Sequence, residues 1–103
     1  MSDPARGPVH ERRVRVVNRF GLHALPASRL VAAVRRFRCQ VSLARDQEPE
    51  VPIDSVMAVL TLGAGPGDEL LLRCRGVDAD AAADTLAALF AAGLGGDGPG
   101  ATG

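Results

Sequence analysis

The sequence predicts an α/β (α+β) fold, a two-layer sandwich in which helices pack against one face of an antiparallel sheet. Short segments in which apolar and polar residues alternate predict strands, and two longer segments with apolar residues every three or four positions predict helices. The 103 residues fit one domain. We expect it to span residues 9–92, between disordered tails over residues 1–8 and the glycine-rich residues 93–103.

The first half of the chain predicts a strand, a helix and a second strand. Residues 9–17 alternate loosely and predict the first strand. Residues 24–37 predict a helix with Pro26 in its first turn, where a missing N–H costs nothing. One apolar stripe runs along this helix and contains Ala27, Leu30, Val31, Val34 and Phe37. Residues 39–43 predict the next strand, whose apolar face would hold Cys39, Val41 and Leu43.

The middle of the chain contains one segment that periodicity does not resolve. Residues 46–48 predict a turn, and residues 50–53 predict a short strand. Residues 55–62 form an apolar run that fits either a strand or a short helix. Residues 68–75 predict a strand with an apolar face of Leu70, Leu72 and Cys74.

The last predicted element is a helix over residues 79–92. Asp78 is a suitable N-cap, and Gly93 is a suitable stop. Its inward face would contain Ala82, Leu86, Leu89 and Phe90. The element order is therefore strand, helix, two strands, an ambiguous segment, strand and helix.

Composition excludes several classes of function. The formal net charge is zero, which argues against nucleic acid as a partner, because phosphate backbones reward a basic excess. No apolar run approaches the roughly 20 residues of a membrane span, and no signal peptide is visible, so we expect a cytoplasmic protein without membrane insertion. Two cysteines are too few for a disulfide scaffold or a zinc site. Neither a metal, nor a cofactor, nor a hydrolase or oxidoreductase motif is predicted.

Residues 21–27, with the sequence GLHALPA, form the most informative segment. They place His23 between a glycine loop and the start of a helix, where free N–H groups and the helix dipole favour an anion. A phosphoryl group on the imidazole would lie within reach of the N–H groups of Ala24 and Leu25. Gly21 allows a sharp turn without crowding the ring. From position alone, His23 could also simply end a loop.

Two segments resemble the HPr family, the histidine-containing phosphocarriers of the sugar phosphotransferase system. Residues 21–27 look like its phosphorylation-site motif, usually GLHARPA, and residues 54–63 (DSVMAVLTLG) look like the segment around its regulatory serine. The resemblance covers residues 9–92. It implies an open-faced sandwich with element order βαββαβα, a four-stranded antiparallel sheet in the strand order 1-4-2-3, and a short helix over residues 55–62.

The resemblance also implies a function and a set of partners. His23 would accept a phosphoryl group from Enzyme I and pass it to a IIA-type permease domain or a regulatory kinase. The protein would be a monomeric phosphotransfer intermediate rather than a stand-alone catalyst. Ser55 would correspond to the serine on which a kinase, and a phosphorylase, act in some members; its other interpretation is a helix N-cap alone.

Val56, Met57 and Leu60 become candidates for the apolar surface that contacts partners. Their other interpretation is core, which we prefer for Val59 and Leu62. The family's sheet order would also set the strands of the two cysteines side by side. We therefore expect Cys39 and Cys74 to be neighbouring, reduced and buried thiols.

Leu25 is the departure from the family motif that matters, because the family has arginine there. It lies opposite the buried stripe, so we expect it to be exposed. It could contact a partner, or it could be a neutral change. Arg29, four residues on, and Arg19, in the preceding loop, are candidates to replace the missing charge, or they are solvated surface charges. The alternative function is a regulatory interaction module with weakened or lost phosphotransfer.

Overall fold

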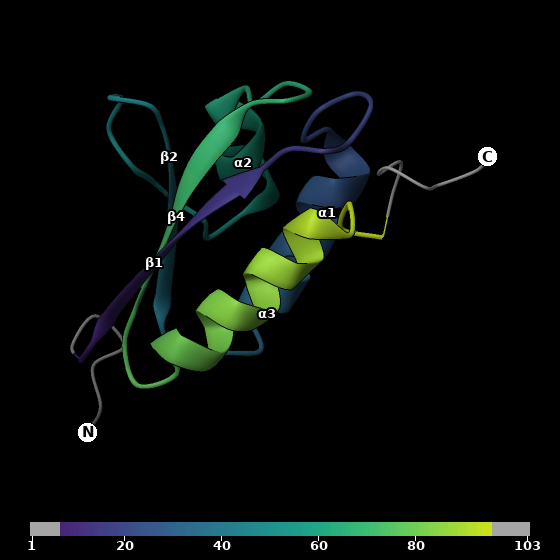
Figure 1. The fold of residues 1–103 in the computed structure, drawn as a ribbon. Coiled ribbons are helices and arrows are strands. Elements are labelled where there is room, and N and C mark those ends of the chain that lie inside the picture. Colours follow the sequence, from purple (N-terminus) through teal and green to yellow (C-terminus); the bar gives the residue numbers. More distant parts are fainter. Residues whose placement is uncertain (1–6, 96–103) are drawn as a thin grey trace.

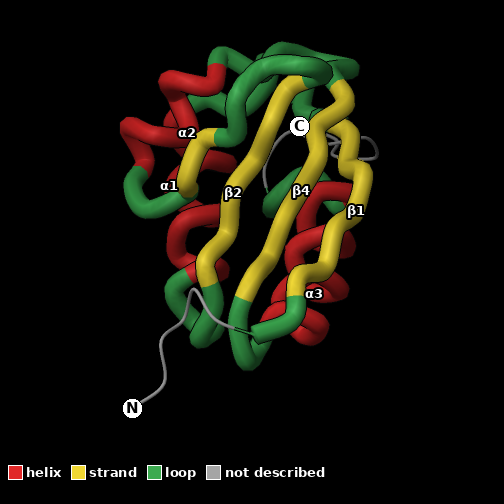
Figure 2. The backbone as a smooth tube through the Cα atoms, turned by 90° about the vertical axis from the view of Figure 1, so that its left-hand side faces the viewer, coloured by secondary structure: helices red, strands yellow, loops and turns green. Residues whose placement is uncertain are grey.

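A computed structural model describes residues 7–95 and shows a sheet covered by helices on one face (Figure 1). The elements, in chain order, are β1 (Val9–Arg15), α1 (Ala24–Val34), β2 (Gln40–Arg45), β3 (Val51–Pro52), α2 (Val56–Leu62), β4 (Glu69–Arg75) and α3 (Ala79–Ala91). All strand pairs are antiparallel, and the strand order is β1-β4-β2-β3. The fold class, the sheet order and the short helix α2 are confirmed. Figure 2 looks onto the open face of the sheet, with the helices behind it.

The core lies between the sheet and the helices. The predicted apolar face of β4, formed by Leu70, Leu72 and Cys74, has no exposed surface. Leu30 of α1 and Leu86 of α3 meet it from the helix layer and are equally buried. Burying one such leucine stabilises the fold by roughly 1.5–3 kcal/mol. In α3, Ala82 and Phe90 are buried as predicted, whereas Leu89 is half-buried.

Several elements are shorter than predicted. Helix α1 ends at Val34 rather than at residue 37, because the N–H groups of Arg36 and Phe37 bond to carbonyls three residues back, at 3.1 Å each. Strand β1 ends at Arg15, where its last pair with β4 forms. Strand β3 consists of Val51–Pro52 alone, and proline suits such a sheet edge.

The two predicted helix caps behave differently. Ser55 Oγ accepts the N–H of Ala58 at 3.1 Å, which confirms the N-cap role. Asp78 occupies the N-cap position of α3, as predicted, and its carbonyl accepts the N–H of Ala82 at 2.9 Å, but its side chain makes no capping hydrogen bond. Its Oδ2 instead accepts the N–H of Arg38 at 2.7 Å and ties the start of α3 to the chain after α1.

The folded part extends past the predicted end at residue 92. Gly93 turns the chain with φ +80°, as a helix stop should, and Leu94 then returns to the core with only 1% of its surface exposed. The N–H of Leu94 donates to the carbonyl of Leu89 at 2.8 Å, which closes the end of the helix. The predicted tail therefore begins too early at this end. Residues 1–6 and 96–103 lie outside the described part of the chain.

The two cysteines are neighbours with unequal burial. Cys74 is fully buried, and burial, together with the nearby Cys39 thiol, raises its pKa to about 12. Cys39 lies one residue before β2 and is only half-buried, so the prediction of a buried thiol is wrong for this residue. Burial and then the charge of Asp78 raise the pKa of Cys39 as well. Within residues 7–95, no helix is long and apolar enough to cross a membrane.

Candidate functional site

His23 occupies the N-cap of α1. Its backbone is extended (φ −80°, ψ −170°), its carbonyl accepts the N–H of Ala27 at 3.0 Å, and its side chain is half-buried. The N–H groups of Ala24 and Leu25 have no intrahelical partner in the first turn, and Pro26 has none to offer. The imidazole therefore sits at the positive end of a helix, beside backbone donors that could serve an anion.

Backbone contacts fix the loop that precedes His23. The N–H of Leu22 donates to the carbonyl of Ala64 at 3.0 Å, across to the loop between α2 and β4. Gly21 has φ +74°, and a Cβ there would lie 2.5 Å from that same carbonyl oxygen. Only glycine fits, so the predicted need for Gly21 arises from this close approach.

The end of α3 also contacts this loop. The buried Asn18 donates from Nδ2 to the carbonyl of Gly93 at 2.9 Å. Sequence reasoning missed both Asn18 and Ala64. Asparagine in a loop gave a weak signal for a structural hydrogen bond, whereas nothing in the sequence marked Ala64, because its role depends on its carbonyl alone.

Two exposed apolar side chains flank His23 in the chain. Leu25 has 49% of its surface exposed, as predicted. Phe20 is 69% exposed, and its ring centroid lies 6.2 Å from that of His23, with the planes at 73°. Such edge-to-face contacts orient a ring without covering it. Phe20 was not predicted, although a phenylalanine three residues before His23 could have been noticed.

The residues predicted to form an apolar surface on α2 differ in their exposure to solvent. Met57 is 69% exposed and Leu60 is 38% exposed, whereas Val56 is half-buried and packs on the core. Val59 and Leu62 are buried, as predicted. Because α2 packs against α1, the exposed residues lie on the neighbour of the helix that His23 begins.

The two candidate arginines are both exposed. Arg29 lies along the chain that follows α3: its Nη1 is 3.1 Å from the place that a Cβ on Gly95 would take. Arg19 lies in the turn before Gly21. Among residues 7–95 no group of three or more His, Cys, Asp or Glu side chains is placed to hold a metal ion.

The chain is similar to known proteins over most of its length. Residues 10–92 match the family described as "PTS HPr component phosphorylation site". The phosphocarrier protein HPr of Haloferax volcanii is 44% identical over 77 residues, which are 74% of this chain and 86% of the relative. The phosphocarrier protein NPr of Proteus mirabilis is 37% identical over 83 residues, or 81% and 92% of the two chains.

The fold is also similar to solved structures of HPr proteins. The crystal structure of HPr-C-His from Thermoanaerobacter tengcongensis superposes with a TM-score of 0.78 at 29% identity, and the match covers 84% of this chain and 97% of that one. The family match extends over most of the chain and includes the segment around His23. The chain therefore belongs to the HPr family of phosphocarrier proteins of the phosphotransferase system.

Proposed function

We propose that His23 accepts a phosphoryl group from Enzyme I and passes it to a IIA-type permease domain or a regulatory kinase in the cytoplasm. The observation that carries the proposal is the half-buried imidazole at the N-cap of α1, beside the N–H groups of Ala24 and Leu25. A neutral imidazole is a nucleophile near pH 7. Its ring nitrogen forms a bond to phosphorus while the bond from phosphorus to the donor breaks, and the donor leaves with that electron pair.

The test is labelling with phosphoenolpyruvate and Enzyme I, followed by mass spectrometry for acid-labile phosphate. We expect one phosphoryl group on the wild type and none on His23→Ala. His10, the other histidine, lies on β1 near Asp80 and provides the matched control. His10→Ala should be labelled like the wild type. Unchanged labelling of His23→Ala would refute the proposal.

A second function, regulation by binding alone, is favoured by Leu25. This exposed side chain stands where the family motif has arginine, and leucine cannot neutralise a phosphoryl group. The N–H groups of the first helical turn do not depend on that side chain, which is why we favour transfer. Binding of Enzyme I without labelling would favour the regulatory function instead.

We further propose that Arg29 supplies part of the missing charge. It follows Leu25 by one helical turn, and helical side chains lean toward the N-terminus. Arg29→Ala should speed hydrolysis of the isolated phosphoprotein by about two- to fivefold, the effect of one partly ordered charge-assisted hydrogen bond. Arg35→Ala, an exposed change at the other end of α1, is the control. Equal hydrolysis rates in all three proteins would remove Arg29 from the phosphate site. Arg19 is tested in the same way.

The surface formed by Leu25, Met57 and Leu60, together with Val56, is proposed as the docking surface. Met57→Glu should raise the KM for transfer from Enzyme I and leave folding intact, because this side chain is largely exposed. Ser55 is proposed as a regulatory phosphorylation site for a serine kinase. A phosphoryl group there would add negative charge at the N-terminus of α2, on the helix that carries three of the docking residues.

A further inference from the structure

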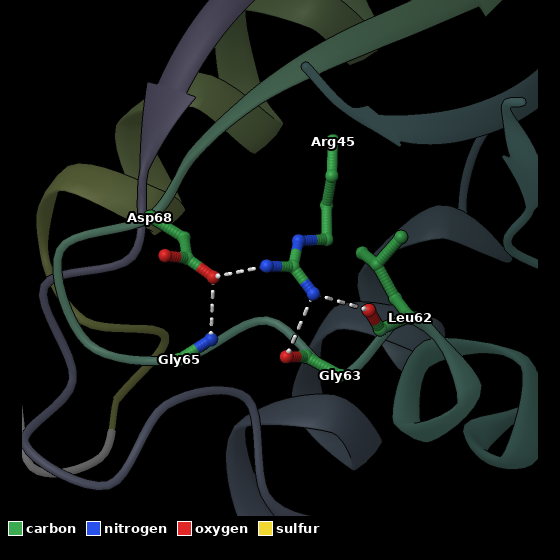
Figure 3. Close-up of polar contacts among 5 residues, drawn as sticks. All are labelled: Arg45, Leu62, Gly63, Gly65 and Asp68. Atoms are coloured by element: carbon green, nitrogen blue, oxygen red, sulfur yellow. Dashed lines mark hydrogen bonds and ion pairs between the residues drawn. The ribbon is translucent and has the colours of Figure 1, made fainter. Parts of the chain in front are cut away.

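One arginine and one aspartate connect β2, α2 and the start of β4 (Figure 3). Arg45, the last residue of β2, donates from Nη1 to the carbonyls of Leu62 and Gly63 at 3.3 and 3.2 Å. Its Nη2 lies 3.4 Å from Asp68 Oδ2. The same carboxylate oxygen accepts the N–H of Gly65 at 2.8 Å. We call Arg45 and Asp68 the loop clamp.

The loop clamp acts on backbone groups rather than on charge alone. The last carbonyls of a helix carry partial negative charge and lack intrahelical donors, so a guanidinium is a suitable cap for the end of α2. The side chains of Arg45 and Asp68 are 37% and 33% exposed, so the pair is partly shielded from water. On its other side the loop is held by Val16, whose N–H donates to the carbonyl of Asp68 at 2.8 Å and whose carbonyl accepts the N–H of Gly67 at 2.7 Å.

The clamped loop carries the carbonyl that holds the phosphoacceptor segment. Ala64 lies between Gly63 and Gly65, both of which the clamp contacts. Its carbonyl oxygen accepts the N–H of Leu22, the residue directly before His23. The separation between this oxygen and Gly21 is small enough to exclude a Cβ, so the loop and the segment cannot slide past each other freely.

We propose that Arg45 and Asp68 are positioning residues for phosphoryl transfer: they fix the carbonyl of Ala64, which in turn holds Leu22 and sets the place of the His23 imidazole. The inference rests on the proposed function of His23. The contacts that connect them to the His23 segment run through the backbone of the loop. Transfer depends on alignment of the attacking nitrogen, and a shift of about 1 Å from a distant change can slow a reaction up to roughly 100-fold.

The experiment compares Arg45→Gln with Arg73→Gln. Arg73 is the matched control, because it is 32% exposed and contacts two carboxylates on the open face of the sheet, away from the clamped loop. In the unphosphorylated protein, hydrogen exchange at the Leu22 amide should be about tenfold faster in Arg45→Gln, as expected for local opening, and unchanged in Arg73→Gln.

The second measurement is transfer from Enzyme I. Arg45→Gln should lower kcat by about three- to tenfold with little change in KM, because alignment rather than docking is altered. Asp68→Asn should have a smaller effect of the same kind, since an amide oxygen can still accept the N–H of Gly65. Arg45→Lys should restore part of the loss. Asp68→Asn and Arg45→Lys also keep the test decisive if Arg45→Gln does not fold.

Two results would overturn the proposal. The first is a Leu22 amide that exchanges its hydrogen at the wild-type rate in the variants of Arg45 and Asp68. The second is a loss of transfer that Arg73→Gln shares equally, which would reflect general destabilisation. If the wild type takes no phosphate at all, the proposed function fails, while the exchange measurement still decides whether the clamp holds the His23 segment.

Discussion

The loop between β1 and α1 (the His23 loop) and the open face of the sheet are held by different kinds of contact. Backbone hydrogen bonds and the side chain of Asn18 hold the loop, and two apolar side chains that flank His23, Phe20 and Leu25, are exposed. On the open face, Arg73 bridges Glu11 and Glu50 across the sheet, with Nε 2.7 Å from Glu11 Oε2. The hydrogen bond that Arg73 donates to Glu11 and the charges of both carboxylates raise the pKa of Arg73. One region keeps its side chains available to partners, whereas the other pairs its charges internally.

The two regions depend on different kinds of atoms. In the proposed function, the N–H donors at the start of α1 do not depend on the side chain at position 25. The open face depends on side chains, so substitutions there remove contacts directly. Substitutions in the His23 loop and on the open face of the sheet test this difference.

The largest effect is expected where backbone packing itself is altered. Gly21→Ala adds a Cβ 2.5 Å from the Ala64 carbonyl at a residue with φ +74°. Backbone strain and loss of the Leu22 hydrogen bond should lower the free energy of unfolding by about 2–4 kcal/mol, measured by urea denaturation.

Gly67→Ala is the control for this change. Gly67 has φ +83°, but no atom lies within 4 Å of an added Cβ. It should lose only about 1 kcal/mol, the cost of the backbone conformation. If both variants lose the same amount, the close approach at Gly21 is relaxed easily, and the loop is less fixed than its contacts indicate.

The next effect concerns position 25, where this chain has leucine and the family motif has arginine. Leu25→Arg adds a guanidinium near the phosphoryl group, and one well-placed charge-assisted hydrogen bond contributes about 1.5–3 kcal/mol. We expect transfer from Enzyme I to be about tenfold faster. Ala32→Arg adds the same charge farther along the exposed side of α1 and should leave the rate unchanged. A slower Leu25→Arg would mean that the partner contacts leucine.

The next prediction concerns the two faces of β4 and the pH dependence of stability. Arg73 points to the open face, and the adjacent Cys74 points to the core, where its pKa rises from 9.0 to about 12. The unfolded chain loses the thiol proton first, so the contribution to stability is complete below pH 9 and is lost toward pH 12. The free energy of unfolding should fall by up to about 1.4 kcal/mol per pH unit in this range.

Denaturation at several alkaline pH values measures this dependence. Cys74→Ala should lack most of this slope, whereas Cys39→Ala should lose only the smaller part that the Cys39 thiol contributes, because burial is the main cause of the raised Cys74 pKa. At neutral pH a thiol reagent should modify the half-buried Cys39 well before Cys74 in the native protein. Equal rates for the two thiols would contradict the burial of Cys74.

The smallest effect is expected on the open face. Arg73→Gln removes both carboxylate contacts, yet all three side chains are partly exposed, so stability should fall less than in Gly21→Ala. The loss should shrink in 1 M salt, where the screening length is about 3 Å. Phosphotransfer should be unaffected. A loss that salt does not change would indicate packing by the arginine stem rather than charge pairing.

The sequence predicted what is local and periodic. The stripe of α1, the apolar face of β4 and the placement of His23 at a helix start each depend on a few consecutive residues. Helix α2 required the resemblance, because an apolar run of that length has no decisive period. The side-chain contact of Asp78 and the burial of Leu94 were not predicted for a common reason: each residue contacts another part of the chain, the N–H of Arg38 in one case and the core in the other.

The loop clamp lay beyond prediction for the same reason. Arg45 and Asp68 are far apart in the sequence, and either could have paired elsewhere. Their contact follows from the register of β2 and β4, in which Arg45 lies opposite Leu70. No pattern within either segment indicates that a third segment, the one before His23, depends on them.

The bond between Asn18 and Gly93 also has a practical consequence for labelling and immobilisation. It joins the residues that follow α3, near the end of the described chain, to the loop that precedes His23. Gly7, at the other end of the described chain, lies against Gly76 beside the start of β1. A fluorophore at residue 95 would therefore report directly on docking at His23, whereas surface attachment through the N-terminal side would leave that docking unobstructed.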